Sequence, residues 1–396
     1  MLNCYKRLLF GPWEKSSWAS KMVLNPAMIQ DPKNPQTIHM LFRATGPCPN
    51  KQLQGKPLPF PISLGYAVSH DQGQSWLIDF DKPALAPDLK YEADEIYLPD
   101  GRVNYANGCI EDPRLFYFEE QLYLSAACRV FPPGPYWEKD DPKQCMPDWI
   151  FSRSGNLKRA VKENYTVSVL YKVNLNELAS QNYDSAFEYQ CPLHNPDAGD
   201  NRDVFLFPER INGKIICLHR PKNPQEYKEG KELDKPSIFI AAADSIEQLS
   251  GDKAIQKVLA IPCFKWESNR IGASWPPLKL DSSNWLLPYH GKQDDYVGYT
   301  QSFMILRESG NNILEVIQRS PERMMYADKE WEQGTDFPTP CLFTCSGVLL
   351  NNGKLLMGYG AADQKVCIAE TDLSSLLETI GYSKKTADIP GSNDLA

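Results

Sequence analysis

The stretch Ser69-His70-Asp71-Gln72-Gly73-Gln74-Ser75-Trp76 indicates most about the fold of this chain. It fits the pattern Ser-x-Asp-x-Gly-x-x-Trp, whose fixed residues each suit a tight turn between two β-strands. The carboxylate of Asp71 can accept hydrogen bonds from the turn backbone, Gly73 allows a positive φ, and Trp76 can pack across the hairpin. The stretch therefore predicts a β-hairpin with a capped turn.

Weaker versions of the same turn follow apolar segments elsewhere in the chain. They are Ile240-Ala241-Ala242-Ala243-Asp244-Ser245-Ile246, Ile368-Ala369-Glu370-Thr371-Asp372-Leu373 and Val169-Leu170-Tyr171-Lys172-Val173-Asn174-Leu175. Turns of this kind, known as Asp boxes, connect the strands of β-propellers, and such repeats favour blades arranged around an axis. An ordinary β-sandwich with coincidental turns is the alternative that these features leave open.

Short segments rich in apolar, β-branched and aromatic residues recur along the chain, whereas long amphipathic helical patterns are scarce. The expected strands include Ile38–Phe42, Leu115–Phe118, Gln121–Ala126, Lys214–Leu218, Ser237–Ala241, Trp285–Tyr289 and Leu355–Gly358. Asn212-Gly213 and Asn352-Gly353 are hairpin signals, and Leu373–Thr379 is a short helical pattern. These patterns predict an all-β chain.

The chain contains no linker that would divide it, so we expect a single domain over residues 1–396 with a core from about 22 to 378. Residues 132–155 interrupt the strand pattern with prolines, charges and two tryptophans, which predicts a long ordered loop overhanging a site. Residues 384–396 are polar and predict a frayed tail.

Composition and charge exclude several classes of function. The net charge is −8, from 42 Lys and Arg against 50 Asp and Glu, and no basic stripe is visible, so we expect no nucleic-acid partner. The apolar run Leu8-Leu9-Phe10 is shorter than the roughly 7–15 residues of a signal peptide, and no stretch approaches the ~18 apolar residues of a membrane span. We therefore expect a cytoplasmic protein with no membrane contact, and a homo-oligomer is compatible with these features.

The chain is rich in aromatic residues, with 9 Trp, 19 Tyr and 16 Phe, and it contains 11 cysteines without framework spacing. Aromatic rings can pack against the C–H face of a sugar, so this composition suits carbohydrate binding. The cysteines are expected to be reduced and mostly buried, and the close pair Cys341 and Cys345 to have a packing role. The five histidines are widely spaced, which predicts no metal site.

The segment Glu111-Asp112-Pro113-Arg114 places two carboxylates in succession just before an expected strand. Adjacent residues of an extended chain point to opposite faces, so one carboxylate can enter a cavity while the other is structural. A solvated turn is the plain alternative for this motif.

The ordered set of motifs along residues 22 to 378 resembles family 130 of the glycoside hydrolases, the mannoside phosphorylases and β-mannosidases. The motifs are Leu24-Asn25-Pro26, Phe42-Arg43-Ala44-Thr45-Gly46, Leu64-Gly65-Tyr66-Ala67-Val68-Ser69, Glu111-Asp112-Pro113-Arg114, Leu206-Phe207-Pro208, Gly213-Lys214, Leu218-His219-Arg220-Pro221, Ile271-Gly272-Ala273, Pro276-Pro277, Tyr289-His290-Gly291 and Tyr359-Gly360-Ala361-Ala362-Asp363. This resemblance implies a five-bladed β-propeller that cleaves β-linked manno-oligosaccharides with inversion and without a cofactor.

The resemblance also implies roles for individual residues. Asp112 is expected to be the general acid, which protonates the leaving oxygen through a mannose hydroxyl, and partial burial is expected to raise its pKa. The residues expected to bind substrate are Asn25, Arg43, Arg114, His290 and Asp363. For Arg43 and Asp363, a salt bridge between blades is the alternative, and for His290 a purely structural role.

The attacking group can be phosphate or water. For a phosphorylase, the resemblance points to Arg202, His219 and Arg220 as phosphate-binding residues. Phosphorylases of the family usually have an arginine at the position that we align with Thr166, and Arg159 or Lys162 are nearby cations that could compensate.

For an inverting hydrolase, a carboxylate base about 6.5–9.5 Å from the acid is needed, and Glu209 and Glu267 are the candidates. The arginine missing at Thr166 makes hydrolysis of β-mannosides the preferred interpretation. The alternatives are a β-mannoside phosphorylase, with inorganic phosphate as co-substrate and mannose 1-phosphate as product, and a propeller that binds mannosides without turnover.

Overall fold

The structure is a computed structural model that describes residues 2–46, 52–53, 56–57, 61–133, 146–152, 157–293, 298–310, 313–334 and 340–382. The expected tail at 384–396 and most of the expected loop at 132–155 lie outside these ranges. Within them, no helix is long and apolar enough to cross a membrane.

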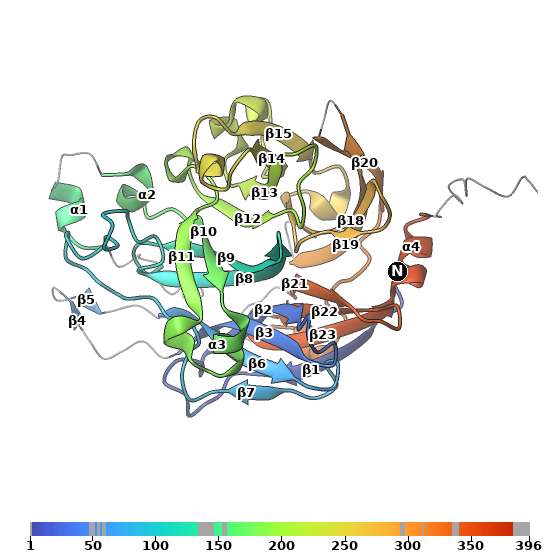
Figure 1. Cartoon of the computed structure of the whole chain (residues 1–396), viewed down its shortest axis with the longest axis horizontal. Helices are drawn as coiled ribbons and strands as arrows, with labels where there is room; N and C mark the ends of the chain where they lie inside the picture. The colour runs from blue at the N-terminus through green and yellow to red at the C-terminus, as the bar shows by residue number, and fades with distance from the viewer. Residues whose placement is uncertain are drawn as a thin grey trace, which may run out of the picture.

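The described residues form mainly antiparallel β-sheets, which lie around a common centre in the view of Figure 1. The largest sheet has eight strands, but its halves meet only through a single parallel pair, Ile62 and Cys109. The first half contains β2 (Met22–Gln30), β3 (Ile38–Thr45), β6 (Ile62–Ser69) and β7 (Leu77–Asp79). The second half contains β8 (Cys109–Phe118), β9 (Gln121–Arg129), β10 (Val167–Val173) and β11 (Phe187–Pro192).

Three further sheets follow the same antiparallel order. The third unit contains β12 (Asn201–Leu206), β13 (Ile215–Pro221), β14 (Ile238–Ala243) and β15 (Ile255–Ala260). The fourth contains β16 (Arg270–Ala273), β17 (Leu278–Lys279), β18 (Asn284–Lys292), β19 (Tyr299–Ser309) and β20 (Ile313–Arg319). The fifth contains β21 (Leu342–Leu349), β22 (Lys354–Ala361), β23 (Lys365–Asp372) and, from the other end of the chain, β1 (Tyr5–Phe10).

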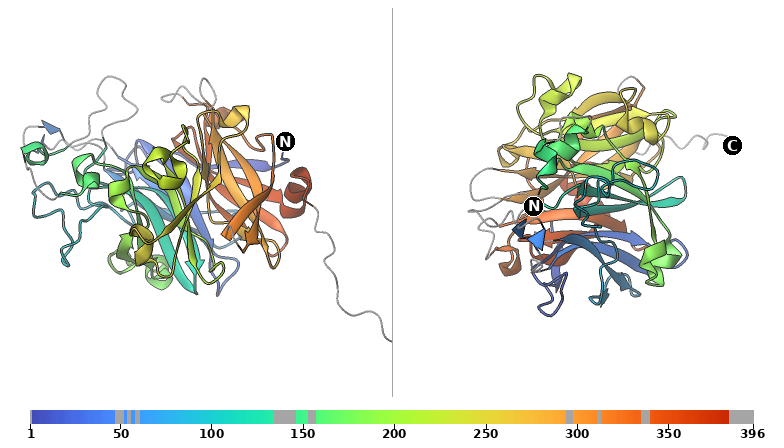
Figure 2. Two further views of the ribbon diagram at one scale, coloured as in Figure 1. Left: turned by 90° about the horizontal axis from the view of Figure 1, so that it is seen from above. Right: turned by 90° about the vertical axis from the view of Figure 1, so that its left-hand side faces the viewer.

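Helices in the described part of the chain are short. The α-helices are α1 (Trp149–Ser152), α2 (Arg159–Lys162), α3 (Leu175–Ala179) and α4 (Leu373–Thr379). Short 3-10 turns are η1 (Tyr183–Ser185), η2 (Pro196–Ala198), η3 (Pro224–Glu226), η4 (Lys228–Gly230), η5 (Glu247–Ser250), η6 (Lys265–Glu267) and η7 (Glu330–Glu332). Figures 1 and 2 place α1 and the small hairpin of β4 (Gln52–Leu53) and β5 (Lys56–Pro57) to one side of the sheets. The expected mostly-β class is confirmed.

Apolar clusters fill the spaces between successive units. One cluster joins the first and second units through Leu41 and Leu124, and another joins the fourth and fifth through Phe303 and Leu355. A further cluster contains residues from the second, third and fourth units, and another joins the first unit to the fifth. Because apolar burial is the main favourable term in folding, these clusters fix how the sheets pack against one another.

The turn at Ser69–Trp76 has the structure that its sequence predicts, because it connects β6 to β7. Asp71 accepts a hydrogen bond from the backbone N–H of Ser75 (2.8 Å) and another from its hydroxyl (2.6 Å). These bonds lower the pKa of Asp71 to about 2. Gly73 has a φ of +86°, and the Trp76 indole donates to its carbonyl oxygen.

The weaker versions of this turn occupy equivalent places in the other units. Val173, Ala243 and Asp372 end β10, β14 and β23, as Ser69 ends β6, and each of these strands is the third of its unit. The repeat in the sequence therefore corresponds to a repeat in the structure.

Gly73→Ala is expected to lower the free energy of unfolding by about 2 kcal/mol. A non-glycine residue at a positive φ costs roughly 1–2 kcal/mol, and a Cβ atom at this position would lie only 2.6 Å from Cδ2 of Leu356. Gly353→Ala is the matched control, because Gly353 has a φ of +82° with no atom within 4 Å of the added Cβ. Urea unfolding of both variants checks the prediction, and an equal loss in the two would show that the contact with Leu356 has no effect.

Candidate functional site

Asp112 lies in a cavity of about 250 Å³, and each of the five units contributes at least one residue to its lining. The lining residues are Asn25, Arg43, Glu111, Asp112, Arg129, Pro133, Arg202, Asp203, Arg220, Tyr299, Phe343 and Asp363. Four of these side chains are arginines and four are carboxylates. The cavity therefore combines groups that can bind an anion with groups that can exchange a proton or bind hydroxyls.

The same backbone feature places a polar side chain in the cavity from three successive units. The first strand of each unit departs from regular pairing at Asn25, Asp112 and Asp203, and these residues have φ values of +50°, +50° and +55°. Asn and Asp tolerate this left-handed conformation better than other non-glycine residues. A β-bulge redirects the side chain that it contains, so the bulges explain why these three residues reach the centre.

The carboxylate of Asp112 is surrounded by donors. Asn25 donates to its Oδ1 (2.8 Å), Arg43 lies at 3.1 Å from the same oxygen, and Arg202 lies at 3.5 Å from Oδ2. Burial alone would raise the pKa of Asp112, but the guanidinium groups of Arg43, Arg202 and Arg114 outweigh it and lower the pKa. The expectation of a raised pKa is therefore wrong for the free protein, because the positive charge of three guanidinium groups has a larger effect on the pKa than burial has.

Glu111 is the structural partner of Asp112. It is buried, and its carboxylate lies 3.0 Å from Arg43 and 3.6 Å from Arg202. Arg43 and Arg202 thus each bind both carboxylates, which holds the two guanidinium groups at the edge of the cavity. The alternation expected for adjacent residues is consistent with this division of roles.

Arg114 and His290 lie beneath the cavity and do not line it. Arg114 donates to the backbone oxygens of Asp112 (2.9 Å) and Pro113 (3.1 Å), which holds the bulge in place. Nε2 of His290 lies 3.3 Å from Asp203, and burial lowers the pKa of His290. Both residues were expected to bind substrate, and the structure gives them contacts that position other groups.

Asp363, in the turn after β22, contributes a carboxyl group to the cavity. Burial raises the pKa of Asp363, which favours its protonated form more than for an ordinary aspartate. The rings of Tyr299, at the start of β19, and Phe343, on β21 of the neighbouring unit, lie 5.0 Å apart and line the same cavity. A carboxyl group beside aromatic rings suits a sugar, whose hydroxyls need polar partners and whose C–H face packs on a ring.

Glu209, one of the two expected bases, lies outside this cavity. It is about half exposed, forms an ion pair with Lys279, and lines a separate surface hollow with Trp275 and Trp285. The residue follows β12 at the end remote from the bulge at Asp203, so the strand direction carries it away from Asp112.

Glu267, the other expected base, is fully buried and has partners for both oxygens. It accepts hydrogen bonds from the backbone N–H groups of Cys263 (2.7 Å) and Phe264 (3.1 Å) and from the hydroxyl of Tyr289 (2.9 Å). Arg319 lies 2.7 Å away and completes the set. A carboxylate held in this way stabilises its own turn and is not positioned to activate a water molecule.

An internal repeat explains the role of Glu267. Glu332 follows a tryptophan in the same way, accepts from the backbone of Asp328 and Lys329, and binds the hydroxyl of Tyr359 (2.8 Å). Its cation is Lys6, at 3.1 Å. The Trp-Glu pair is therefore a structural motif of the fourth and fifth units.

His219 also lies away from the cavity. It is buried among Tyr227 and Phe239, and its ring nitrogens face Asn201 (3.0 Å) and Gln256 (2.9 Å). Burial lowers the pKa of His219 to about 3, so the ring is neutral at physiological pH. The expected role of His219 as a phosphate-binding cation is wrong for this arrangement, whereas Arg202 and Arg220 do line the cavity.

Four lining residues were not foreseen from the sequence: Arg129, Asp203, Tyr299 and Phe343. Asp203 could have been found, because it repeats the position of Asn25 and Asp112 at the start of a unit. It accepts from Arg220 and lies 3.7 Å from Arg114, and these cations outweigh the effect of burial and lower the pKa of Asp203. Arg129 and Phe343 have no local signal, since the register between strands brings them to the cavity.

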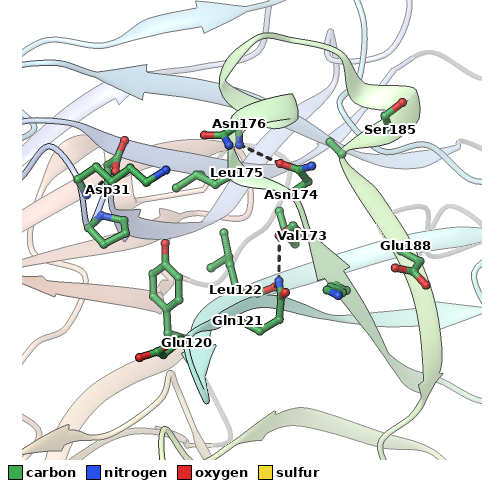
Figure 3. Close-up of a pocket in the computed structure, with 15 residues that line it drawn as sticks. Asp31, Glu120, Gln121, Leu122, Val173, Asn174, Leu175, Asn176, Ser185 and Glu188 are labelled. Atoms are coloured by element: carbon green, nitrogen blue, oxygen red, sulfur yellow. Dashed lines mark hydrogen bonds between the residues drawn. The ribbon is translucent and has the colours of Figure 1, made fainter.

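A larger hollow of about 460 Å³ lies at the other end of β8 and β10 (Figure 3). Its lining includes Asp31, Glu120 and Glu188. Two side-chain amides of the lining form hydrogen bonds with the backbone: Gln121 donates to the carbonyl of Val173, and Asn174 accepts from the N–H of Asn176. Charged groups of both signs are spread along this hollow and do not converge on one point. Size alone therefore does not make it the functional site, and the smaller cavity at Asp112 is the better candidate.

The fold and the cavity together define a class of protein. A mostly-β chain carries, at the centre of its sheets, an aspartate held by an amide and guanidinium groups, a second carboxyl group and an aromatic wall. No three His, Cys, Asp or Glu side chains in the described ranges gather so as to hold a metal ion. This is the arrangement of a carbohydrate-active enzyme that uses carboxyl groups for proton transfer.

Comparison with known proteins gives the family. The family described as β-1,4-mannooligosaccharide phosphorylase, glycoside hydrolase family 130, matches residues 164–381. The chain belongs to this family.

Relatives match over most of the chain. The 1,2-β-oligomannan phosphorylase of Thermoanaerobacter sp. (strain X514) is 25% identical over 365 residues, which cover 92% of this chain and 95% of the relative. The β-1,2-mannobiose phosphorylase of Listeria innocua is 24% identical over 318 residues, covering 76% and 83%.

Solved structures share the fold. The Listeria innocua β-1,2-mannobiose phosphorylase in complex with β-1,2-mannobiose superposes with a TM-score of 0.61 at 18% identity, covering 95% of this chain and 93% of that one. A family 130 structure described with glycoside hydrolases that target β-1,2 mannosidic linkages in Candida mannan has a TM-score of 0.59 at 14% identity, covering 94% of both chains. The fold alone therefore does not distinguish phosphorolysis from hydrolysis.

Proposed function

We propose that this enzyme is an inverting β-mannoside phosphorylase, which cleaves β-linked manno-oligosaccharides with phosphate and releases mannose 1-phosphate. The observation that carries the proposal is the convergence of Arg43, Arg129, Arg202 and Arg220 on the cavity of Asp112. A phosphate dianion needs convergent cations, and guanidinium groups are especially suited to its oxygens.

The cavity gives less support to hydrolysis, the interpretation that the sequence favoured. Neither Glu209 nor Glu267 lines the cavity, and an inverting hydrolase needs a carboxylate base opposite its acid. Of the other lining carboxylates, Glu111 and Asp203 are held by arginines, and Asp363 is assigned to the bound mannose. The relatives named as phosphorylases agree with this change of preference.

The proposed reaction assigns a role to each group. The mannose bound at the cleavage point contacts Asn25, Arg43 and Asp363, and a phosphate oxygen held by Arg202 and Arg220 attacks the anomeric carbon. As the new C–O bond forms, the glycosidic bond breaks on the opposite face. The leaving oxygen receives the proton of Asp112 through a mannose hydroxyl, which gives α-mannose 1-phosphate and a shortened acceptor.

Phosphate itself would prepare Asp112 for this role. In the free protein the surrounding guanidinium groups lower the pKa of Asp112, so the carboxyl group is ionised at neutral pH. A phosphate dianion beside Arg202 would offset part of this positive charge and raise the pKa of Asp112 towards the value that an acid needs. Phosphate binding would thus be accompanied by protonation of the catalytic residue.

We further propose that the five sheet units are the blades of a five-bladed β-propeller, with β1 closing the last blade. The support is the order of contacts between the innermost strands, from β2 to β8, β8 to β12, β12 to β16 and β21 back to β2. The apolar clusters between neighbouring units are also what stacked blades require. Asp112 would then lie near the central axis of the propeller. The localisation that we propose for the enzyme is the cytoplasm.

Product analysis with β-1,2- and β-1,4-linked manno-oligosaccharides, with and without phosphate, tests the function. We expect mannose 1-phosphate only when phosphate is present, and at most trace mannose without it. Both linkages are needed because the family is described for β-1,4-manno-oligosaccharides, whereas the relatives that match most of the chain are named for β-1,2-linked substrates. Free mannose released at the same rate in either condition would support hydrolysis, and binding without any product would support a non-catalytic mannoside-binding protein.

A further inference from the structure

The resemblance to the family leaves the proposed phosphate site without one cation, at Thr166. The resemblance aligns Thr166 with an arginine that is usual in phosphorylases of the family. In the structure Thr166 is fully buried, and its hydroxyl lies 3.5 Å from a carboxylate oxygen of Asp200. The side chain of Thr166 therefore faces Asp200 but carries no positive charge that could bind phosphate.

Arg129 brings a guanidinium group to the same carboxylate from the adjacent strand. It is the last residue of β9, which pairs with β10 so that Cys128 lies opposite Val167, and Arg129 consequently lies opposite Thr166. Nη2 of Arg129 lies 3.7 Å from the same Asp200 oxygen that the Thr166 hydroxyl approaches. A guanidinium group therefore reaches Asp200 from β9, the strand paired with β10.

Asp200 links Arg129 to the rest of the cationic cluster. Its other oxygen lies 3.9 Å from Nε of Arg202, the guanidinium group next to Asp112. Although burial alone would raise the pKa of Asp200, Arg202, Arg129 and nearby cations lower it, so the carboxylate is ionised. One carboxylate thus holds Arg129 and Arg202 at neighbouring positions of the cavity wall.

The other contact of the Arg129 side chain is to a neutral group, so it orients the guanidinium group without pairing it with a second carboxylate. Nη1 of Arg129 donates a hydrogen bond to the backbone carbonyl of Asn164 (2.7 Å). Nε of Arg129 is buried without a hydrogen-bond partner among the described residues. The side chain is 12% exposed and lines the Asp112 cavity. An anion is the ligand that such a partly desolvated guanidinium group favours.

Arg159 and Lys162, the two cations near Thr166 in the sequence, do not reach the cavity of Asp112. Arg159 is bound to Glu226 (2.6 Å) and Glu163 (2.9 Å) at the surface, and Lys162 does not line the cavity. Neither side chain is placed to complete the site.

From these contacts we infer that Arg129 binds the phosphate co-substrate together with Arg202, in place of the arginine that Thr166 lacks. The inference rests on the proposed function, since it names a residue of the same site. It gives Arg129 contact with phosphate and leaves mannoside binding to Asn25, Arg43 and Asp363.

Direct binding of inorganic phosphate, followed by calorimetry, tests the inference without relying on turnover. Arg129→Gln is expected to weaken phosphate binding at least tenfold, whereas Arg159→Gln, which removes a surface arginine from the same part of the chain, should bind like the wild type. In phosphorolysis of β-1,2-mannobiose, Arg129→Gln should raise the KM for phosphate by a similar factor and change the KM for mannobiose less than threefold.

A position swap separates phosphate binding from a structural effect. In Arg129→Gln/Thr166→Arg the guanidinium group returns to the strand where relatives of the family carry it, and phosphate affinity should recover to within about threefold of the wild type. Unchanged phosphate affinity in Arg129→Gln, or equal losses for phosphate and mannobiose, would overturn the inference. A wild type that binds phosphate through Arg129 but releases free mannose would overturn the proposed function alone, and a wild type that does not bind phosphate would overturn both.

Discussion

Asp112→Asn is expected to lower kcat for phosphorolysis by about 10²–10⁴-fold, the range over which a positioned general acid contributes to catalysis. Asparagine has the same shape as aspartate, so Asn25 and Arg43 keep a polar neighbour and the cavity keeps its volume. The amide cannot deliver the proton that the leaving oxygen needs. Release of mannose 1-phosphate from β-1,2-mannobiose at saturating phosphate measures the effect.

The same variant should bind phosphate at least as tightly as the wild type. Because Arg43 and Arg202 lower the pKa of Asp112 in the free protein, the carboxylate is ionised and repels an incoming dianion. The substitution removes that negative charge from the neighbourhood of Arg202. Loss of turnover with retained phosphate and mannobiose binding would distinguish the role in proton transfer from general damage to the site.

Glu209→Gln is the matched control, because it neutralises a carboxylate that the sequence also offered for catalysis but that lies outside the cavity. Its kcat should remain within about twofold of the wild type. If Asp112→Asn kept more than a tenth of the wild-type kcat, or Glu209→Gln lost as much as Asp112→Asn, the assignment of the acid would be wrong.

The sequence predicted best those features that depend on neighbouring residues. The capped turn at Asp71 and the helix Leu373–Thr379 both follow local rules for turns and helices, and both are found where they were expected. The mostly-β class followed from the same short-range patterns. The resemblance to the family added what local rules could not, namely that Asn25, Arg43 and Asp363 would meet around Asp112.

The features that were missed depend on packing between distant strands. Glu267 is a plausible base in the sequence, but Tyr289 and Arg319 come from other strands to enclose it. His219 sits one residue before Arg220, and alternation along β13 sends the first into the core and the second into the cavity. A shift of one residue in register reverses such assignments, so the sequence alone could not decide between them.

Lys6→Met is expected to lower the free energy of unfolding by about 3–5 kcal/mol, because it leaves a buried carboxylate without its cation. Lys6 is on β1, its side chain is 4% exposed, and Nζ lies 3.1 Å from the fully buried carboxylate of Glu332 and 2.7 Å from Asp328. Since a domain of this kind is stabilised by only about 5–15 kcal/mol, the loss would be a large part of the total. Urea unfolding followed by tryptophan fluorescence gives the measurement.

Lys354→Met provides the control for Lys6→Met. Lys354 pairs with Glu370 in the same sheet but is 43% exposed, so solvent screens the pair and its loss should lower the free energy of unfolding much less than the loss of Lys6. The double variant Lys6→Met/Glu332→Gln removes both charges and should recover part of the stability lost in Lys6→Met. Equal effects of Lys6→Met and Lys354→Met would show that the buried pair adds no more than a surface pair.

The effect of Lys6→Met also bears on why the site needs both ends of the chain. β1 pairs with β23, so the N-terminal strand belongs to the same sheet as the turn that carries Asp363. Asn25, on the next strand after β1, reaches Asp112 from the first unit. If the Lys6 pair holds β1 onto the rest of the fifth unit, Lys6→Met should keep a near wild-type kcat while it is folded at 25 °C, but should lose activity at a temperature that falls in step with its Tm. Loss of activity well below the unfolding transition would instead indicate that β1 positions the catalytic groups directly.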